Sequence, residues 1–130
     1  MADGAQSKIS LSRVVMRLAR NPGTEFADGD DHRGYSLVAP LTPDHKLDET
    51  AFRAARGSCT VRRFAPDEDP QEGKLVHRNG RWFFDYGDQG DAEEPLYRLG
   101  DHSFGLGDYV SITDEDGRLL TYKVTEVQRA

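Results

Sequence analysis

The chain has 130 residues, of which 36% are hydrophobic, 13 are glycine and 6 are proline. This length suffices for one domain that buries a continuous core without metals or disulfides, and the composition predicts a folded core with long polar loops. The formal net charge of −6 is uneven, because residues 1–66 carry ten Lys and Arg against eight Asp and Glu, whereas residues 67–130 carry seven against fifteen. Binding to a phosphate backbone requires a cationic surface, so we expect no nucleic-acid partner.

Cys59 is the only cysteine, which argues against an internal disulfide and a thiolate-rich metal site. Its β-branched surroundings, "GSCTVRRF", favour a small buried thiol. No apolar run approaches the roughly 20 residues that span a bilayer, and the N-terminus lacks the apolar core of a signal peptide. We therefore expect a soluble cytoplasmic protein without a membrane partner.

The segment "ISLSRVVMRLARNPG" predicts an amphipathic helix over residues 10–20. Its apolar residues recur at helical spacing, Ser10 can cap its start, and "NPG" can end it. The helix either packs on the domain or detaches to meet an acidic partner, and the sequence leaves both open. The apolar stripe consists of Leu11, Val14, Val15 and Leu18, and the basic stripe consists of Arg13, Arg17 and Arg20.

The middle of the chain predicts two strands, a short helix and a charged loop. Residues 34–41 and 59–64 have the composition of strands. Between them, Asp48 can cap a helix over "ETAFRAA", and Gly57 can end it. The segment "APDEDPQEG", residues 65–73, contains two prolines and is expected to be a loop.

The segment "KLVHRNGRWFFDY" predicts a β-hairpin, because Asn79-Gly80 is the pair that a two-residue type I′ turn prefers. This turn sets a register that runs from Arg78 opposite Arg81 to a final pair of Lys74 and Asp85. Alternate side chains then share a face. The face expected to be buried contains Leu75, His77, Trp82, Phe84 and Tyr86.

A second hairpin is predicted in "GDYVSITDEDGRLLTYKVTEV". Placing Ile112 opposite Leu120 and Val110 opposite Tyr122 aligns the apolar residues and leaves a three-residue loop that ends in glycine. Residues 108–127 resemble a hairpin of the sortases, which are cysteine transpeptidases built on a β-barrel, and the resemblance implies barrel geometry. The nucleophilic cysteine of that family follows such a hairpin. In this chain the cysteine precedes it, so we expect no transpeptidase chemistry.

Together these segments, with a further strand at Pro95–Leu99, predict a mainly β fold that borders on α+β. We expect a small, antiparallel, partly open β-barrel of six or seven short strands with an N-terminal amphipathic helix. Residues 1–8 should be a flexible N-terminus and residues 9–130 a single domain, whose β-rich body covers residues 34–128. As a whole, the chain resembles small uncharacterised bacterial proteins of unknown function, which implies a bacterial origin.

The sequence shows none of the common catalytic motifs, so we expect no catalytic residues, no cofactor and no metal site. Calcium loops counted from Asp28 and from Asp85 both fail, because the required ligands are missing at their later positions. Weak cation binding by the acidic loop 87–94 remains open, as does the oligomeric state.

Two functions are compatible with these observations. The leading hypothesis is a non-enzymatic binding or adaptor module that recognises a protein or peptide. Its expected contact residues are Arg13, Arg17, Arg20, Arg78, Arg81, Asp88, Asp91, Glu93 and Glu94. The alternative is a small-molecule-binding or enzymatic site in the barrel mouth, lined by aromatic residues and histidine. Its expected lining residues are His77, Trp82, Tyr86, Tyr97 and His102.

Overall fold

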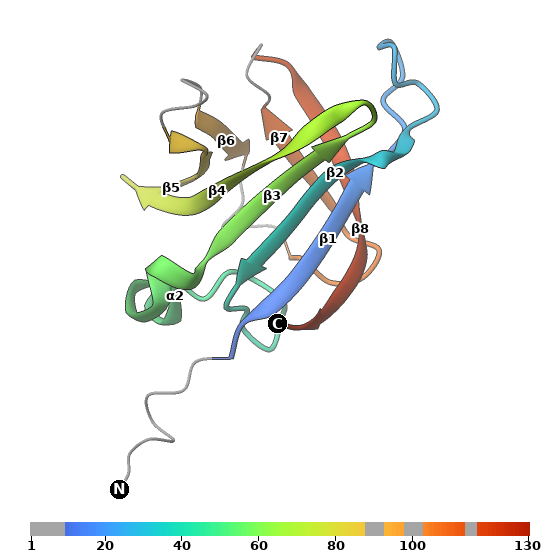
Figure 1. The fold of residues 1–130 in the computed structure, drawn as a ribbon. Helices are drawn as coiled ribbons and strands as arrows, with labels where there is room; N and C mark the ends of the chain where they lie inside the picture. The colour runs from blue at the N-terminus through green and yellow to red at the C-terminus, as the bar shows by residue number, and fades with distance from the viewer. Residues whose placement is uncertain (1–9, 88–92, 98–102, 114–116) are drawn as a thin grey trace, which may run out of the picture.

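The computed structural model describes residues 10–87, 93–97, 103–113 and 117–130 (Figure 1). Within these ranges the chain forms eight antiparallel strands that pair in chain order, and β1 also pairs with β8, so that the sheet closes into a barrel. The strands are β1 (Ser12–Leu18), β2 (Asp30–Ala39), β3 (Thr60–Ala65), β4 (Glu68–Arg78), β5 (Arg81–Asp85), β6 (Glu93–Tyr97), β7 (Tyr109–Thr113) and β8 (Leu119–Arg129). Helix α2 (Glu49–Ala55) and a 3-10 turn (Arg56–Ser58) lie between β2 and β3.

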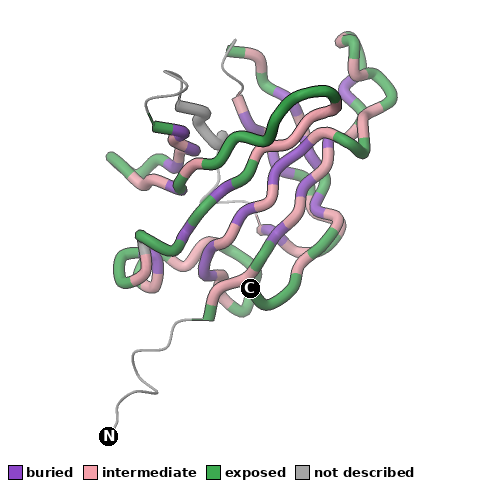
Figure 2. The backbone as a smooth tube through the Cα atoms, viewed as in Figure 1, coloured by how far each residue is buried: buried purple, intermediate pink, exposed green. Residues whose placement is uncertain are grey.

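The interior of the barrel is filled by alternate residues of the strands, which Figure 2 shows as buried positions separated by more exposed ones. Successive side chains of a strand point to opposite faces, so a closed sheet directs every second residue inward. The largest side chains that are almost completely buried are Tyr35, Phe84, Phe104, Met16, Leu37, Ile112, Val14, Val61, Val110 and Val124.

The predicted helix over residues 10–20 is wrong, because residues 12–18 form strand β1. The spacing of Val14 and Leu18 fits one face of a helix, but with Met16 it also fits the inward face of a strand. In the barrel these three side chains are buried, while Arg13 is exposed and Arg17 half-buried on the outer face. Pairing with both β2 and β8 satisfies the backbone of this segment, and these tertiary contacts override its helical pattern.

The expected charged loop over residues 65–73 is also wrong, because β4 already begins at Glu68. Pro66 and Asp67 form a tight turn, with Asp67 at a φ of 61°. The register shifts between Arg63 and Ala65, and this irregularity places Pro70 outside the regular pairs that β3 makes with β4. The predicted barrel was partly open and had six or seven strands. With β1 and this longer β4, the described residues instead form a closed barrel of eight strands.

The predicted first hairpin is confirmed pair by pair, from Arg78 opposite Arg81 to Lys74 opposite Asp85. Asn79 and Gly80 both have positive φ, as a type I′ turn requires. In the second hairpin the predicted pairs of Ile112 with Leu120 and of Val110 with Tyr122 are confirmed. Gly117 has the expected positive φ, but the rest of the predicted loop, residues 114–116, lies outside the described residues.

The short helix α2 is confirmed at residues 49–55, with the side chain of Asp48 accepting a hydrogen bond from the backbone N–H of Ala51 at 3.1 Å. Phe52 is its buried residue, and its ring lies edge-on to Trp82, with 5.0 Å between the ring centroids. Trp82 in turn stacks on His77 at 4.2 Å. The helix therefore packs against the end of the barrel that carries the β4–β5 turn.

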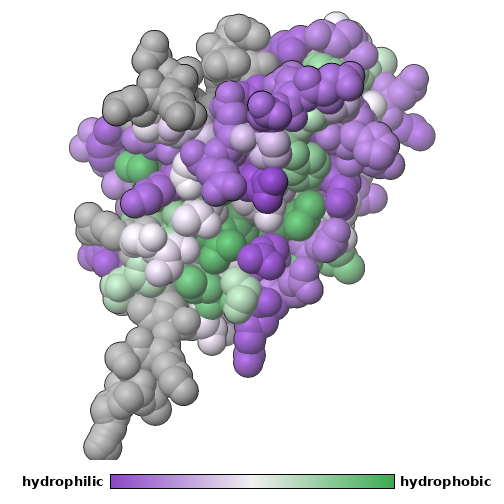
Figure 3. Space-filling model, in the orientation of Figure 1, coloured by the Kyte–Doolittle hydropathy of each residue, from purple (hydrophilic) through white to green (hydrophobic). Residues whose placement is uncertain are grey.

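The outer face of the barrel is mixed in character. In the view of Figure 3, hydrophobic side chains gather over the lower part of the face that β1 and β2 present, and hydrophilic side chains surround them. Val15 of β1 and Val38 of β2 alternate with buried positions and are half-buried on the outer face of the sheet. Among the described residues, no helix has the length and apolar character that a membrane crossing requires.

Gly34 generates a prediction about barrel closure. A Cβ atom at this position would collide with the backbone carbonyl oxygen of Met16 on the paired strand. We expect Gly34→Ala to lower the free energy of unfolding by about 1–3 kcal/mol or more, because two paired backbones would have to move apart. Urea denaturation measures this loss. The control is Gly57→Ala, whose added Cβ would meet no atom within 4 Å and should change stability by less than about 0.5 kcal/mol. Equal stability losses in the two variants would contradict the prediction.

Candidate functional site

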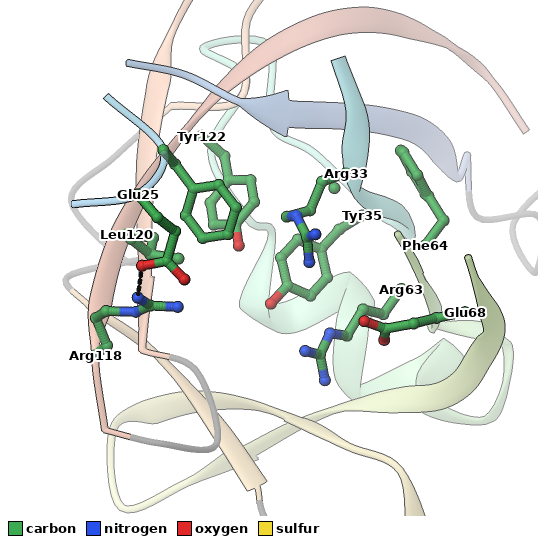
Figure 4. Close-up of a pocket in the computed structure, with 11 residues that line it drawn as sticks. Glu25, Arg33, Tyr35, Arg63, Phe64, Glu68, Arg118, Leu120 and Tyr122 are labelled. Atoms are coloured by element: carbon green, nitrogen blue, oxygen red, sulfur yellow. Dashed lines mark hydrogen bonds and ion pairs between the residues drawn. The ribbon is translucent and has the colours of Figure 1, made fainter. Parts of the chain in front are cut away.

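A cavity of about 270 Å³ lies at the end of the barrel opposite α2, where the β1–β2, β3–β4 and β7–β8 connections meet (Figure 4). We call this cavity the mouth. Its lining includes three arginines, two tyrosines and two glutamates that come from four separate parts of the chain. These residues are Glu25, Arg33, Tyr35, Arg63, Glu68, Arg118 and Tyr122.

Two tyrosines form the inner part of the mouth. Tyr35 on β2 is 1% exposed and Tyr122 on β8 is 4% exposed, and their rings meet edge-on with 5.0 Å between centroids. Tyr35 also packs on Phe84 in the core at 5.2 Å. The rings are thus held by apolar packing, while both hydroxyl groups point toward the space between the arginines (Figure 4).

The loop between β1 and β2 reaches the rim of the mouth because Asn21 fastens it to β8. The Asn21 amide donates hydrogen bonds to the carbonyl oxygens of Ala19 and Thr121 at 2.8 and 3.1 Å, and it accepts one from the N–H of Thr121 at 2.9 Å. The backbone N–H of Asn21 donates to the carbonyl oxygen of Phe26 at 2.9 Å, which closes the loop on itself. This short polar side chain therefore determines where Glu25 and Phe26 lie.

Phe26 organises two of the arginines. Its ring lies 4.8 Å from the guanidinium carbon of Arg33 and 5.4 Å from that of Arg118, which are distances of cation–π contacts. The Nε atom of Arg33 is buried without a hydrogen-bond partner in the described structure, although Asp30 Oδ2 lies 3.5 Å away. The mouth thus holds a partly buried guanidinium group with unused donor capacity.

Glu25 and Arg118 form an ion pair at the rim, with Glu25 Oε1 at 2.6 Å from Arg118 Nη1 (Figure 4). The hydrogen bond from Arg118 is the main cause that lowers the pKa of Glu25 below its ordinary value of 4.5. The Glu25 side chain is 65% exposed, so water surrounds much of this pair.

Of the five residues predicted for a ligand site, the three with described side chains do not line the mouth. Trp82 and Tyr86 are buried in the core, and His77 stacks on Trp82 near α2. Tyr97 belongs to β6, of which only the backbone is described, and His102 lies outside the described residues.

A second cavity, of about 470 Å³, lies beside α2 and includes His77 in its lining. Phe52, Leu75 and Val76 contribute apolar side chains there, whereas the charged groups Arg53 and Lys74 are both on exposed residues. In the sequence, a combination of aromatic residues and histidine predicted a site that includes His77. The mouth has no comparable signal in the sequence, since its arginines are separated by 30 and 55 positions along the chain.

The described arginines of the predicted partner surface do not form one patch. Arg13 and Arg17 lie on the outer face of β1, whereas Arg78 and Arg81 are exposed at the tip of the β4–β5 hairpin. Arg17 is engaged locally, because it donates hydrogen bonds to Thr125 Oγ1 at 2.6 Å and to Asp31 O at 3.1 Å. The remaining predicted residues are Arg20, exposed in the β1–β2 loop; Glu93 and Glu94, on β6; and Asp88 and Asp91, outside the described residues.

The other reactive side chain of interest, Cys59, is fully buried. Burial raises the pKa of its thiol to about 11, and the Sγ atom donates to the carbonyl oxygen of Ala55 at 3.4 Å. The thiol is therefore protonated at neutral pH and is a poor nucleophile.

Within the described ranges, no three His, Cys, Asp or Glu side chains are grouped so that they could hold a metal ion. The acidic loop 87–94 lies mostly outside those ranges, so cation binding there stays a prediction.

Comparison with known proteins gives no relatives: no protein-family model, no curated protein and no solved structure matches the chain. The case for function therefore depends on the geometry of the mouth.

Loss of the Asn21 amide should destabilise the protein. We expect Asn21→Ala to lower the free energy of unfolding by about 1–3 kcal/mol, because the N–H of Thr121 and two carbonyl oxygens lose a buried partner. Chemical denaturation measures the loss. The control Gln128→Ala removes an amide from an exposed position on β8 and should have little effect. A similar stability for both variants would show that the anchoring role is wrong.

The Glu25 ion pair should be visible in a titration. Because the pKa of Glu25 is lowered, its carboxylate keeps its bond to Arg118 above the ordinary pKa of 4.5 and loses it as the pH falls through the lowered value. In Arg118→Gln, the pKa of Glu25 should rise toward 4.5, which carboxyl-detected NMR can measure. The control variant Arg53→Gln, on α2 at the opposite end of the barrel, should leave the pKa of Glu25 unchanged. An unchanged pKa of Glu25 would contradict the assigned cause.

Proposed function

We propose that the protein is a non-enzymatic binding module that holds a small anionic molecule in the mouth of its barrel. The observation that carries this proposal is the convergence of Arg33, Arg63 and Arg118 on one cavity above two tyrosine hydroxyl groups (Figure 4). Each arginine comes from a different part of the chain, so their proximity is a product of the fold.

The chemistry of this lining suits an oxyanion. A guanidinium group is always charged and presents its N–H donors in a planar fork that matches carboxylate and phosphate oxygens. The tyrosine hydroxyls are neutral groups that can both donate and accept hydrogen bonds. Glu25 and Glu68 are the acidic residues of the lining, and Asp30 lies 3.5 Å from Arg33 Nε. The geometry of the arginine donors, and not an excess of positive charge, therefore favours an oxyanion.

The size of the mouth argues for a small ligand. Its volume of about 270 Å³ lies just below the range of pockets that hold drug-sized molecules, about 300–1,000 Å³. The tyrosine rings and Arg33 are held by packing on other side chains, so the site is largely formed before a ligand binds. Preformed donors reduce the entropy that binding costs.

The positions of the outer arginines support a small-molecule site over a protein or peptide partner. A peptide surface would use the outer arginines, but Arg13 and Arg17 lie on β1 whereas Arg78 and Arg81 lie at the tip of the β4–β5 hairpin. An acidic peptide could also place one side chain in the mouth. Tight binding of a free small anion would support a small-molecule site over such a peptide site.

The test uses two neighbouring arginines on the same strand. Arg63 lines the mouth, whereas Arg62 on β3 is exposed and lines a different, outward-facing pocket. We expect inorganic phosphate to bind at low ionic strength and Arg63→Gln to weaken binding about ten- to hundredfold, because a charged hydrogen-bond donor is lost. Arg62→Gln makes the same change of charge and should leave the affinity within about twofold.

Calorimetry gives the affinities, and NMR chemical shifts of the backbone amides show where phosphate binds. Shifts concentrated around Phe26, Gly34 and Leu120 would support the mouth. Equal losses in the Arg62 and Arg63 variants, or no saturable binding, would overturn the proposed function.

A further inference from the structure

The second cavity, beside α2, lies where β4 extends past the start of β3. The first pair between these strands is Thr60 with Lys74, and the N–H of Leu75 donates to the carbonyl oxygen of Cys59 at 3.0 Å. Beyond this point the 3-10 turn contacts β4, and α2 lies next to it (Figure 1). Side chains of the helix do not fill the space beside the strand, and a cavity of about 470 Å³ remains.

The apolar part of this lining is held in place by the core. Phe52 is 4% exposed and Leu75 is 2% exposed, while Val76 is half-buried. The ring of Phe52 packs edge-on against Trp82 at 5.0 Å, and His77 stacks on Trp82 at 4.2 Å. These contacts form the wall of the cavity before a ligand binds, which reduces the entropy that binding costs.

The charged side chains of the lining are two cations, one from each wall, and the described lining contains no acidic residue. Arg53 on α2 is already paired with Glu49 at 2.6 Å. Lys74 lies opposite Asp85 in the first hairpin, but Asp85 Oδ1 accepts a hydrogen bond from the N–H of Gly87 at 2.8 Å. Within the described ranges Lys74 forms no ion pair, so its ammonium group is the cation that a ligand can use.

The size and lining of the cavity suit a small amphipathic molecule. Its volume of about 470 Å³ falls within the range of pockets that hold drug-sized ligands, about 300–1,000 Å³. An apolar body would remove water from Phe52, Leu75 and Val76, which favours binding. One negative head group could then stay at the exposed end of the cavity, beside Lys74, and set the orientation of the ligand.

We propose that this cavity binds a small apolar monocarboxylate, whose aliphatic or aromatic body lies against Phe52, Leu75 and Val76 and whose carboxylate contacts Lys74. The cavity and the mouth are at opposite ends of the barrel, so this inference does not depend on the function proposed for the mouth.

The first experiment locates the site with two carboxylates. 3-Phenylpropionate has an aromatic body and hexanoate an aliphatic one, and the tighter of the two identifies the preferred body. NMR titration of the full chain at low ionic strength should give saturable shifts of the backbone amides around Gly57, Leu75 and Val76. Absence of saturable binding for both probes, or shifts concentrated around Gly34 and Leu120 in the mouth, would overturn the inference.

The second experiment tests the role of Lys74 by comparing the better carboxylate with its neutral amide, 3-phenylpropionamide or hexanamide. Lys74→Gln should weaken binding of the carboxylate about two- to fivefold, the size expected for an exposed ion pair, and should leave the affinity of the amide unchanged. The control Lys123→Gln removes the same charge from β8, on the opposite side of the closed barrel, and should change neither affinity. Equal effects on carboxylate and amide, or equal effects of the two lysine variants, would overturn the inference.

The third experiment tests the position of the apolar body. Val76→Thr keeps the shape of the side chain but replaces a methyl group with a hydroxyl group, and it should weaken both the carboxylate and its amide about two- to fivefold. The control Val38→Thr makes the same change at a half-buried position on the outer face of β2. Unchanged affinities in Val76→Thr, or equal losses in the two valine variants, would contradict the proposed contact.

The variant Arg63→Gln separates this site from the mouth. Because Arg63 lines the mouth, its loss should leave the affinity of the carboxylate unchanged. A loss of carboxylate affinity in this variant would show that the probe binds in the mouth and would overturn the inference. Carboxylate binding beside α2 without any binding of phosphate would support this inference and overturn the function proposed for the mouth.

Discussion

The pairing of β1 with β8 is the constraint on which the rest of the structure depends. It joins the two ends of the described sheet, so every strand has two neighbours and no backbone edge is left open. Closure also obliges alternate residues to point into one shared interior. Val14, Met16 and Leu18 enter the core for this reason, and a register shift between Val15 and Met16 accommodates the curvature.

The two ends of the barrel have different chemistry because different connections cover them. At one end, α2 places Phe52 against Trp82, and the aromatic packing extends to His77. At the other end, the β1–β2 loop places Glu25 and Phe26 beside arginines that line the same cavity as Tyr35 and Tyr122. A polar recess above the buried aromatic rings results.

Local features were predictable where the deciding physics is local. Asn79 and Gly80 select a tight turn by their tolerance of positive φ, and the turn then determines each pair of the hairpin. Asp48 caps α2 through a bond within its own first turn. The same local reasoning predicted the wrong element for residues 12–18, because their apolar spacing is compatible with both a helix and a strand. Only the neighbouring strands decide between them.

The sequence by itself determined the β-rich class, both hairpin registers, the short helix and the burial of Cys59, since these depend on turn chemistry and on the alternation of apolar residues. Only the tertiary structure decided the role of residues 12–18, the closure of the barrel and the mouth. Arg33, Arg63 and Arg118 carry no signal of proximity in the chain, because surface arginines occur throughout it. They meet because antiparallel strands return their connections to the same end of a closed sheet, and that is a long-range property of pairing.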